Sequence, residues 1–296
     1  MSAVLTLSPC GIGQIVAAYS RQYLVELADG TLLPCLSRGK TSEFVCGDTV
    51  EVLRTSSNQG VIERALPRLS LLFRSDAYRR KYIAANITQI IIVVATEPPF
   101  SDDLLTRCLI AAHEQKLATL IILNKCDLQS ATIQARAQLS PYQNAGYRIL
   151  ELSAKDNIEP LRPCLENQTS VLIGQSGMGK STLINALLPG AQAVTREISS
   201  VLNSGKHTTT RSHLYHINAH SHLIDCPGVQ AFGLHHLNAD TIAAGFVEFS
   251  PYLGKCRFSN CSHQHEPDCA LKMAQQQGKI DARRLRLFQE ISQGAF

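Results

Sequence analysis

The chain has 296 residues, of which 45% are hydrophobic and 18% are charged, and its formal net charge is +4. This length is typical of two or three domains, and the composition is that of a soluble globular protein, which excludes a disordered tail of any size. The charge is spread thinly along the chain, so charge alone argues only weakly for a nucleic-acid partner.

No apolar run reaches the ~18 residues that a membrane span needs. Residues 1–5 carry neither the basic region nor the cleavage site of a signal peptide. We therefore expect a cytoplasmic protein without membrane contact. Of the ten cysteines, seven are scattered through predicted strands and helices, whereas three crowd between residues 256 and 269. In a reducing compartment this crowding points to metal binding.

The first 70 residues read as five short strands separated by turn formers and without a helix. This pattern predicts a small β-barrel of the OB type. Such barrels bind RNA or dock proteins, and both roles stay open because aromatic side chains for base stacking are few. The predicted strands are residues 13–16, 22–27, 31–33, 48–53 and 60–63, and the aromatic residues are Tyr19, Tyr23 and Phe44.

Residues 71–83 combine basic and aromatic side chains. A solvated linker between domains is the favoured interpretation, and an arm that contacts phosphates is the alternative. The basic residues are Arg74, Arg79, Arg80 and Lys81, interleaved with Phe73, Tyr78 and Tyr82.

After Asn86 the pattern changes to buried strands that alternate with helices, which predicts a parallel sheet covered on both faces. Ligands of such sheets bind at the carboxyl ends of the strands. The predicted strands are residues 87–95, 119–123, 147–152 and 171–173, and a helix is predicted over 103–114.

The last of these strands runs into a glycine-rich loop with the pattern G-x-x-x-x-G-K-[ST], followed by a predicted helix. Backbone N–H groups of such a loop surround phosphates, and the helix N-terminus adds partial positive charge. Lys180 is expected to reach the β- and γ-phosphates, and the Ser181 hydroxyl is expected to bind Mg²⁺. The predicted phosphate-binding residues are Gly174, Gln175, Ser176, Gly177, Met178, Gly179, Lys180, Ser181 and Thr182.

Two further polar segments follow strand ends: Asn124, Lys125, Cys126 and Asp127 after one strand, and Ser153, Ala154 and Lys155 after the next. The Asp127 carboxylate can accept hydrogen bonds from the N1–H and the N2 amino group of guanine. Adenine would leave this carboxylate unpaired, and polar sites of this kind discriminate strongly. Lys125 would pack its stem along the base, and Asn124 would brace the loop. Together with the phosphate loop in the same sheet, these segments predict a guanine nucleotide site.

Downstream, a predicted strand leads into Asp225, which begins a D-x-x-G element. Asp225 would hold Mg²⁺, directly or through water, and the N–H of Gly228 would meet the γ-phosphate. Between the phosphate loop and this element, residues 205–211 are rich in threonine. Either Thr209 or Thr210 is expected to close over Mg²⁺.

The order of these elements is unusual, because the guanine-binding segments precede the phosphate loop. In a Ras-like GTPase the phosphate loop comes first. The chain therefore reads as a circular permutation, which is feasible because domain termini often lie close together at the surface. In this arrangement the segment after Gly228 leaves the domain.

The predicted metal ligands are Cys256, Cys261, His263 and Cys269. Three thiolates and one imidazole complete the tetrahedral shell of a structural Zn²⁺, with disulfides or free thiols as the alternatives and His265 as the fallback ligand. A helix is predicted over residues 281–291. Its early arginines are interpreted as a solvated face rather than an RNA contact; they are Arg283, Arg284 and Arg286.

The combination of an OB-like barrel, the permuted nucleotide motifs and the Cys/His module resembles the RsgA (YjeQ) family of GTPases that depend on the small ribosomal subunit. The resemblance covers nearly the whole chain. It implies a multidomain α/β fold: an OB-fold barrel over residues 1–70, a circularly permuted P-loop GTPase domain over 71–235 and a zinc-binding domain over 236–296. It further implies GTP hydrolysis late in maturation of the small (30S) subunit, stimulation by that subunit, contact with 16S rRNA, and a monomer.

The water-orienting glutamine of Ras-like proteins is replaced here by Val229, whose apolar side chain cannot polarise water. The resemblance points instead to His207 as the residue that orients water, with Lys180 and Thr209 as the other catalytic residues. Departures from the family pattern are small, namely Cys226 for a threonine and Lys206 for an arginine. The loop carries Gly177 where potassium-activated GTPases have asparagine, so no potassium dependence is expected.

Two other functions remain open. A nucleotide-gated RNA-binding scaffold with negligible turnover would agree with Val229. An ATP-using P-loop enzyme would bind adenine despite Asp127. The GTPase interpretation is preferred because it accounts for both guanine-type segments.

Overall fold

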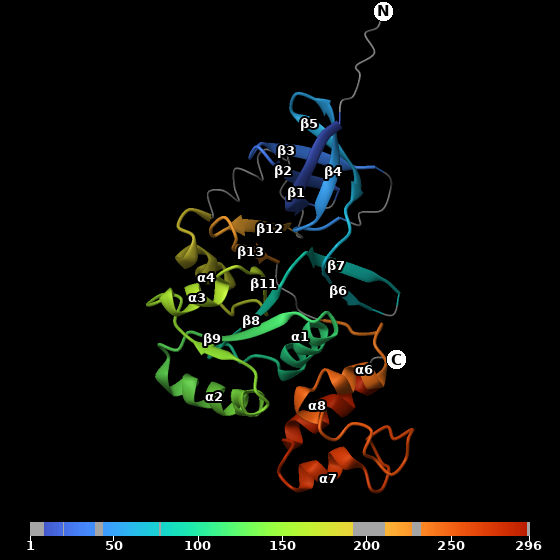
Figure 1. The fold of residues 1–296 in the computed structure, drawn as a ribbon. Coiled ribbons are helices and arrows are strands. Elements are labelled where there is room, and N and C mark those ends of the chain that lie inside the picture. The colour runs from blue at the N-terminus through green and yellow to red at the C-terminus, as the bar shows by residue number, and fades with distance from the viewer. Residues whose placement is uncertain are drawn as a thin grey trace, which may run out of the picture.

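The computed structural model describes residues 9–19, 21–38, 44–76, 78–191, 211–226 and 232–294. Its N-terminal part is a closed barrel of five strands among these residues (Figure 1). β1 pairs with both β2 and β4, and β5 joins β3 to β4. The strands are β1 (Pro9–Tyr19), β2 (Gln22–Leu27), β3 (Leu32–Ser37), β4 (Thr49–Ser56) and β5 (Gln59–Ala65).

Inward-facing side chains fill the barrel. Ile15, Val25, Val50 and Ile62 come from four different strands, and each is 0% exposed. Their alternation with more exposed neighbours is the period of two that a half-buried strand requires. The predicted OB-like barrel is therefore confirmed.

Residues 71–85 form a hairpin rather than the solvated linker that was favoured, so that interpretation was wrong. The two strands are β6 (Leu71–Ser75) and β7 (Arg80–Ala85). The Asp76 carboxylate accepts hydrogen bonds from the backbone N–H groups of Tyr78 and Arg79, which stabilises the turn. Arg79, Arg80 and Lys81 obscured the strand signal because they fall on exposed positions, whereas Leu72 is fully buried.

The central sheet runs in the order β10-β9-β8-β11-β13, and all four pairings are parallel. Ile90, Ile91 and Leu172 are at most 1% exposed, as expected for strands buried on both faces. The strands are β8 (Gln89–Ala95), β9 (Ala118–Asn124), β10 (Ile149–Glu151), β11 (Thr169–Ile173) and β13 (His222–Asp225). The connecting helices are α1 (Asp102–Glu114), α2 (Gln129–Asn144), η1 (Glu159–Leu161), α3 (Arg162–Leu165) and α4 (Lys180–Leu187).

The barrel and the central sheet are joined by hydrogen-bonded strands, which the sequence patterns did not predict. β12 (Arg211–His216) pairs antiparallel with β13 on one side and with β1 of the barrel on the other. The Tyr19 hydroxyl lies 2.7 Å from Nε2 of buried His213 across this seam. The two sheets consequently form one continuous eleven-stranded sheet among the described residues (Figure 1).

The C-terminal region packs two of its helices, α6 and α8, against α1, and α7 packs on α8 (Figure 1). Its core is a cluster of aromatic rings from Phe246, Phe249 and Phe288, whose centroids lie 4.8–5.7 Å apart. Among the described residues, no helix combines the length and the apolar character needed to cross a membrane. The helices of this region are α6 (Ala239–Ala244), η2 (Val247–Phe249), α7 (Ala270–Gln276) and α8 (Ala282–Gln293).

The prediction of a solvated arginine face on α8 is wrong for Arg284. Its side chain is buried and pairs with Glu248 at 2.6 Å. The reason is the helical period, which places residue 284 on the same face as the buried Leu287, Phe288 and Ile291.

Candidate functional site

A cleft of about 360 Å³ lies where the predicted guanine-binding and phosphate-binding segments meet. The strands β8 and β9 end at this cleft, and α4 begins beside it. Segments far apart in the sequence therefore share one cavity. The residues that line it are Glu97, Pro98, Asn124, Lys125, Asp127, Leu128, Ser153, Ala154, Lys155, Gly179 and Thr182.

Asn124 holds three loops together. Its side-chain Nδ2 donates to the carbonyl oxygen of Met178 at 2.9 Å, and its Oδ1 accepts from the backbone N–H of Ala154 at 3.0 Å. The side chain is 2% exposed, so both hydrogen bonds are shielded from water and are costly to break. Asn124 thus fixes both neighbouring segments to the end of β9, as its predicted bracing role requires.

Lys125 bridges two parts of the cleft wall. Its Nζ donates to the carbonyl oxygens of Gly177 and Glu97, each at 2.7 Å. Its backbone φ of 65° lies in the left-handed region, which turns the chain sharply after β9. The aliphatic stem therefore spans the cleft along its wall.

The remaining residues of these two segments differ in orientation. Asp127 and Lys155 line the cleft and are exposed. Ser153 is buried, and its hydroxyl has no hydrogen-bond partner in the described part of the chain. Cys126 is turned toward the backbone: its thiol donates to the carbonyl oxygen of Leu123 at 3.2 Å. The carboxylate and ammonium groups are thus the ones presented to a ligand here.

The phosphate loop is shaped by glycines where no other residue fits. A Cβ at Gly174 would overlap the carbonyl oxygen of Val93, and one at Gly179 would overlap Nδ2 of Asn124. Gly179 also has a φ of 90°, which L-residues rarely adopt. These contacts bring the loop backbone close to the ends of β8 and β9.

Lys180 lies inside the phosphate loop. Its Nζ donates to the carbonyl oxygens of Gly174 at 2.6 Å and Gln175 at 2.9 Å. An ammonium group has three N–H donors, so one remains for a ligand. Burial lowers the pKa of Lys180, and the negative charge of Asp225 opposes this effect.

Asp225 lies on β13 next to the strand that leads into the phosphate loop, in register with Leu172. Burial raises the pKa of the Asp225 carboxyl, and Lys180 opposes that shift. The Asp225 carboxylate and the Lys180 ammonium are therefore close enough for each to affect the pKa of the other. Ser181 and Thr182 are exposed on the first turn of α4. Hard oxygen donors of this kind are suited to Mg²⁺.

Four predicted site residues lie outside the described residues: His207, Thr209, Thr210 and Gly228. Val229 and Lys206 lie outside them as well.

Three cleft residues were missed by the sequence analysis: Glu97, Pro98 and Leu128. Glu97 and Pro98 follow β8 after one intervening residue, Thr96, so the rule that ligands bind at the carboxyl ends of parallel strands could have found them. Leu128 follows Asp127 directly, and no polar pattern marks it.

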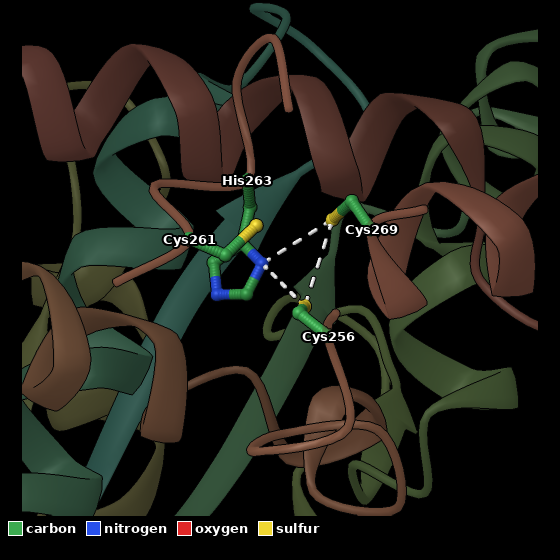
Figure 2. Close-up of side chains that lie close together, drawn as sticks. All are labelled: Cys256, Cys261, His263 and Cys269. Atoms are coloured by element: carbon green, nitrogen blue, oxygen red, sulfur yellow. Dashed lines mark hydrogen bonds between the residues drawn. The ribbon is translucent and has the colours of Figure 1, made fainter. Parts of the chain in front are cut away.

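The four predicted metal ligands converge at one point in the C-terminal region, as Figure 2 shows. Their ligand atoms all lie within 4.8 Å of one another. Sγ of Cys256 is 3.9 Å from Sγ of Cys269 and 3.5 Å from Nδ1 of His263. A tetrahedral ion with bonds of about 2.3 Å to sulfur separates its sulfur ligands by about 3.8 Å. The cluster therefore fits a tetrahedral ion such as Zn²⁺.

The surroundings of the cluster suit metal binding. The backbone N–H of Ala270 donates to Sγ of Cys256 at 3.3 Å, which favours a thiolate. Burial lowers the pKa of His263, so its imidazole is held in the neutral form that binds metals. His265, the fallback ligand, is exposed and lies outside the cluster. The nine cysteines whose side chains are described are free thiols.

The fold and the cleft define the class of this protein. A parallel sheet carries a phosphate loop after β11, and the guanine-type segments after β9 and β10 precede it in the chain. This is the arrangement of a circularly permuted P-loop GTPase.

Comparison with known proteins identifies the family. Residues 65–235 match the family model described as RsgA GTPase. A small ribosomal subunit biogenesis GTPase RsgA from Nitrosospira multiformis is 52% identical over 96% of this chain and 91% of the relative. The protein of the same name from Nitrosomonas europaea is 49% identical over 95% and 91%. The chain belongs to the RsgA GTPase family.

Solved structures support the same fold. YjeQ from Thermotoga maritima matches with a TM-score of 0.73 and 28% identity, over 96% of this chain and 98% of that one. YloQ, described as a circularly permuted GTPase, matches with a TM-score of 0.68 and 23% identity, over 100% and 98%. The predicted fold class and the family resemblance are both confirmed.

Proposed function

We propose that this protein hydrolyses GTP to GDP and phosphate during late maturation of the small (30S) ribosomal subunit, and that the subunit stimulates hydrolysis. The observation that carries the proposal is the single cleft in which Asp127, Lys155 and the phosphate loop meet. The biological setting comes from the relatives, whose name is small ribosomal subunit biogenesis GTPase RsgA.

The nucleotide would lie with its base at Asp127 and its phosphates in the loop from Gly174 to Thr182. Asp127 would accept hydrogen bonds from guanine. Lys125 would support the face of the base while keeping its contacts to the cleft wall. The backbone N–H groups of the loop and the start of α4 would hold the phosphates.

The residues of this chain are suited to bind two metal ions, Mg²⁺ and Zn²⁺. Mg²⁺ would be held at the phosphate end by Ser181, Asp225 and Thr209, and it would neutralise charge on the β- and γ-phosphates. One structural Zn²⁺ would be held by the four C-terminal ligands, whose spacing matches tetrahedral coordination.

Catalysis would depend on positioning and charge neutralisation. The Lys180 ammonium, already inside the loop, would stabilise negative charge at the β–γ bridge. His207 would orient the attacking water, since Val229 cannot. The N–H of Gly228 would contact the γ-phosphate, and Thr209 would complete the closed state.

The partners follow from this function. The barrel and the zinc-binding region would contact 16S rRNA or ribosomal protein. The nucleotide state would control the affinity of these contacts through residues 205–211 and 225–230. We further propose a cytoplasmic monomer, with domains spanning 1–70, 71–235 and 236–296.

The decisive experiment measures single-turnover hydrolysis of GTP as small ribosomal subunits are added. The proposal expects a rate that rises and saturates with subunit concentration. A rate that is negligible and unchanged by subunits would instead favour the RNA-binding scaffold, and equal turnover of ATP would favour the ATP-using enzyme.

The role of His207 is tested with His207→Ala. The stimulated rate should fall by about 10²-fold or more, while the dissociation constant for GDP stays within about threefold. The matched control is His220→Ala, because His220 is an exposed histidine in the turn between β12 and β13. Equal rates for the two variants would overturn the assignment.

A further inference from the structure

The residue that caps the N-terminus of α1 contacts the phosphate loop. The backbone N–H of Ser101, the N-cap of α1, donates to the side-chain oxygen Oε1 of Gln175 at 2.9 Å. The Ser101 hydroxyl in turn accepts from the N–H of Leu104. The position of the Gln175 side chain is therefore tied to the start of α1.

Tyr142 fixes the first turn of α1 from the neighbouring helix α2. Its hydroxyl lies 3.1 Å from Oδ1 of Asp102 and 3.0 Å from Oγ1 of Thr106. Tyr142 and Thr106 are both 0% exposed, so these polar groups depend on each other for hydrogen bonds.

The same network continues into the C-terminal region through Arg284. Its Nη1 donates to Thr106 Oγ1 at 3.1 Å, and its Nε donates to Glu248 at 2.6 Å. The guanidinium lies 4.6 Å from the ring centroid of Tyr142 and 4.4 Å from that of Phe246. A buried arginine satisfied on all these sides has little freedom to move independently of α1.

The helix α8, which carries Arg284, also supports the metal-ligand loop. Nε2 of Gln289 donates to the carbonyl oxygen of His263 at 2.8 Å. The Phe288 ring lies 5.9 Å from the His263 ring. The contacts thus run from the metal-ligand loop through α8 and α1 to the phosphate loop.

We propose that α1 transmits the position of the C-terminal zinc-binding region to the phosphate loop, with Gln175 as the positioning residue at the nucleotide end. Binding of a partner that shifts α8 would change the alignment of the Ser101 N–H with Gln175. The affinity of the phosphate loop for the nucleotide would change as a result. This inference rests on the proposed GTPase function and names one route for its regulation.

The test is a double-mutant cycle with Gln175→Met and Tyr142→Phe, because contiguity alone does not demonstrate coupling. Each single variant should raise the dissociation constant for GDP by about two- to tenfold, the usual effect of one hydrogen bond. The double variant should cost no more than the worse single variant. Multiplicative effects, or no effect of Tyr142→Phe, would overturn the proposal.

Tyr23→Phe is the matched control. Tyr23 lies on β2 of the barrel, outside this network, and is 0% exposed like Tyr142; its ring packs against that of Phe44. Both tyrosine variants lose one buried hydroxyl, but only Tyr142→Phe should change GDP binding. Equal changes in both would show a general effect of packing and overturn the proposal.

Arg284→Lys examines the far end of the network, because lysine keeps the charge near Glu248 but loses the planar set of donors that also reaches Thr106. It should retain its metal content and weaken GDP binding in the same direction as Tyr142→Phe. Unchanged GDP binding would overturn the proposal. A wild-type protein that binds no guanine nucleotide would instead remove the proposed function itself.

Discussion

Asn124 donates a hydrogen bond to the carbonyl oxygen of Met178 across 54 positions of sequence. The same side chain accepts from the N–H of Ala154, so one amide connects the segments that we assign to base and phosphate binding. This relationship is why the permuted order of the motifs does not matter: the sheet brings the strand ends together whatever the order of the strands in the chain.

Asn124→Ala should lower both the affinity of the cleft for nucleotide and the stability of the fold. It leaves a buried carbonyl and a buried N–H without partners, which should lower the free energy of unfolding by about 1–3 kcal/mol. Urea unfolding measures this, and GDP binding should weaken in parallel. The exposed Asn218→Ala, in the turn after β12, is the control. Stability equal to that of wild type would contradict the bracing role.

Asp127→Ala should abolish the preference for guanine. Removing the carboxylate leaves the N1–H and N2 amino groups unpaired, so the preference for GTP over ATP should fall by roughly 10²-fold or more. Competition between unlabelled nucleotides and fluorescent GDP measures it. Asp156→Ala removes an exposed carboxylate outside the cleft lining and should leave the preference intact. Retained guanine selectivity in Asp127→Ala would refute the assignment.

Ser181→Ala should reduce magnesium-dependent turnover by roughly 10- to 100-fold, the usual cost of disturbing a metal site. The thermal unfolding midpoint should change little, because the side chain is exposed on the first turn of α4. Hydrolysis rates measured against magnesium concentration test this. Ser140→Ala, an exposed serine on α2, is the matched variant, and turnover at the wild-type level in Ser181→Ala would argue against magnesium binding there.

Purified protein should contain about one zinc per chain. Cys256→Ser should lose the metal, since serine does not replace a thiolate ligand of Zn²⁺, and the C-terminal region should become more sensitive to proteolysis. Elemental analysis and limited proteolysis measure the two effects. Cys164→Ser changes a cysteine outside the cluster and should keep its zinc. A folded C-terminal region without metal would disprove the structural role.

Stability should fall at mildly acidic pH through His222. Burial lowers the pKa of His222, and the adjacent His216 adds to this shift while Glu26 opposes it. His216 lies between them, with Nδ1 2.8 Å from Nδ1 of His222 and Nε2 2.7 Å from Glu26. The folded state therefore takes up this proton less readily than the unfolded state.

The direction in which stability changes with pH follows from proton uptake by His222. The stabilisation from a neutral His222 is complete above the unfolded pKa of about 6.5 and is lost as the pH falls below it. Urea unfolding between about pH 7.5 and 5.0, a range that brackets this pKa, should show a shallower decline in stability for His222→Gln than for wild type. His113→Gln, which changes an exposed histidine on α1, should follow wild type. Identical profiles for all three proteins would exclude this contribution.

The local motifs were readable from the sequence because each needs a fixed residue at a fixed spacing. The phosphate loop requires Gly174 and Gly179 where a side chain would collide with another strand end, and the metal cluster requires four ligands within one short segment. The apolar runs of β8 and β9 were also predictable, since strands buried on both faces are nearly continuous in apolar residues.

The long-range relationships were decided only by the tertiary structure. The pairing of β12 with β1, the burial of Arg284 and the hydrogen bond from Ser101 to Gln175 depend on which surfaces come together. An arginine on a helix has the same local preference whether it faces water or a carboxylate, so the sequence favoured the commoner exposed state. The sequence by itself therefore determined which chemical groups the protein carries, and packing determined which of them touch, because contacts between distant segments leave no local pattern.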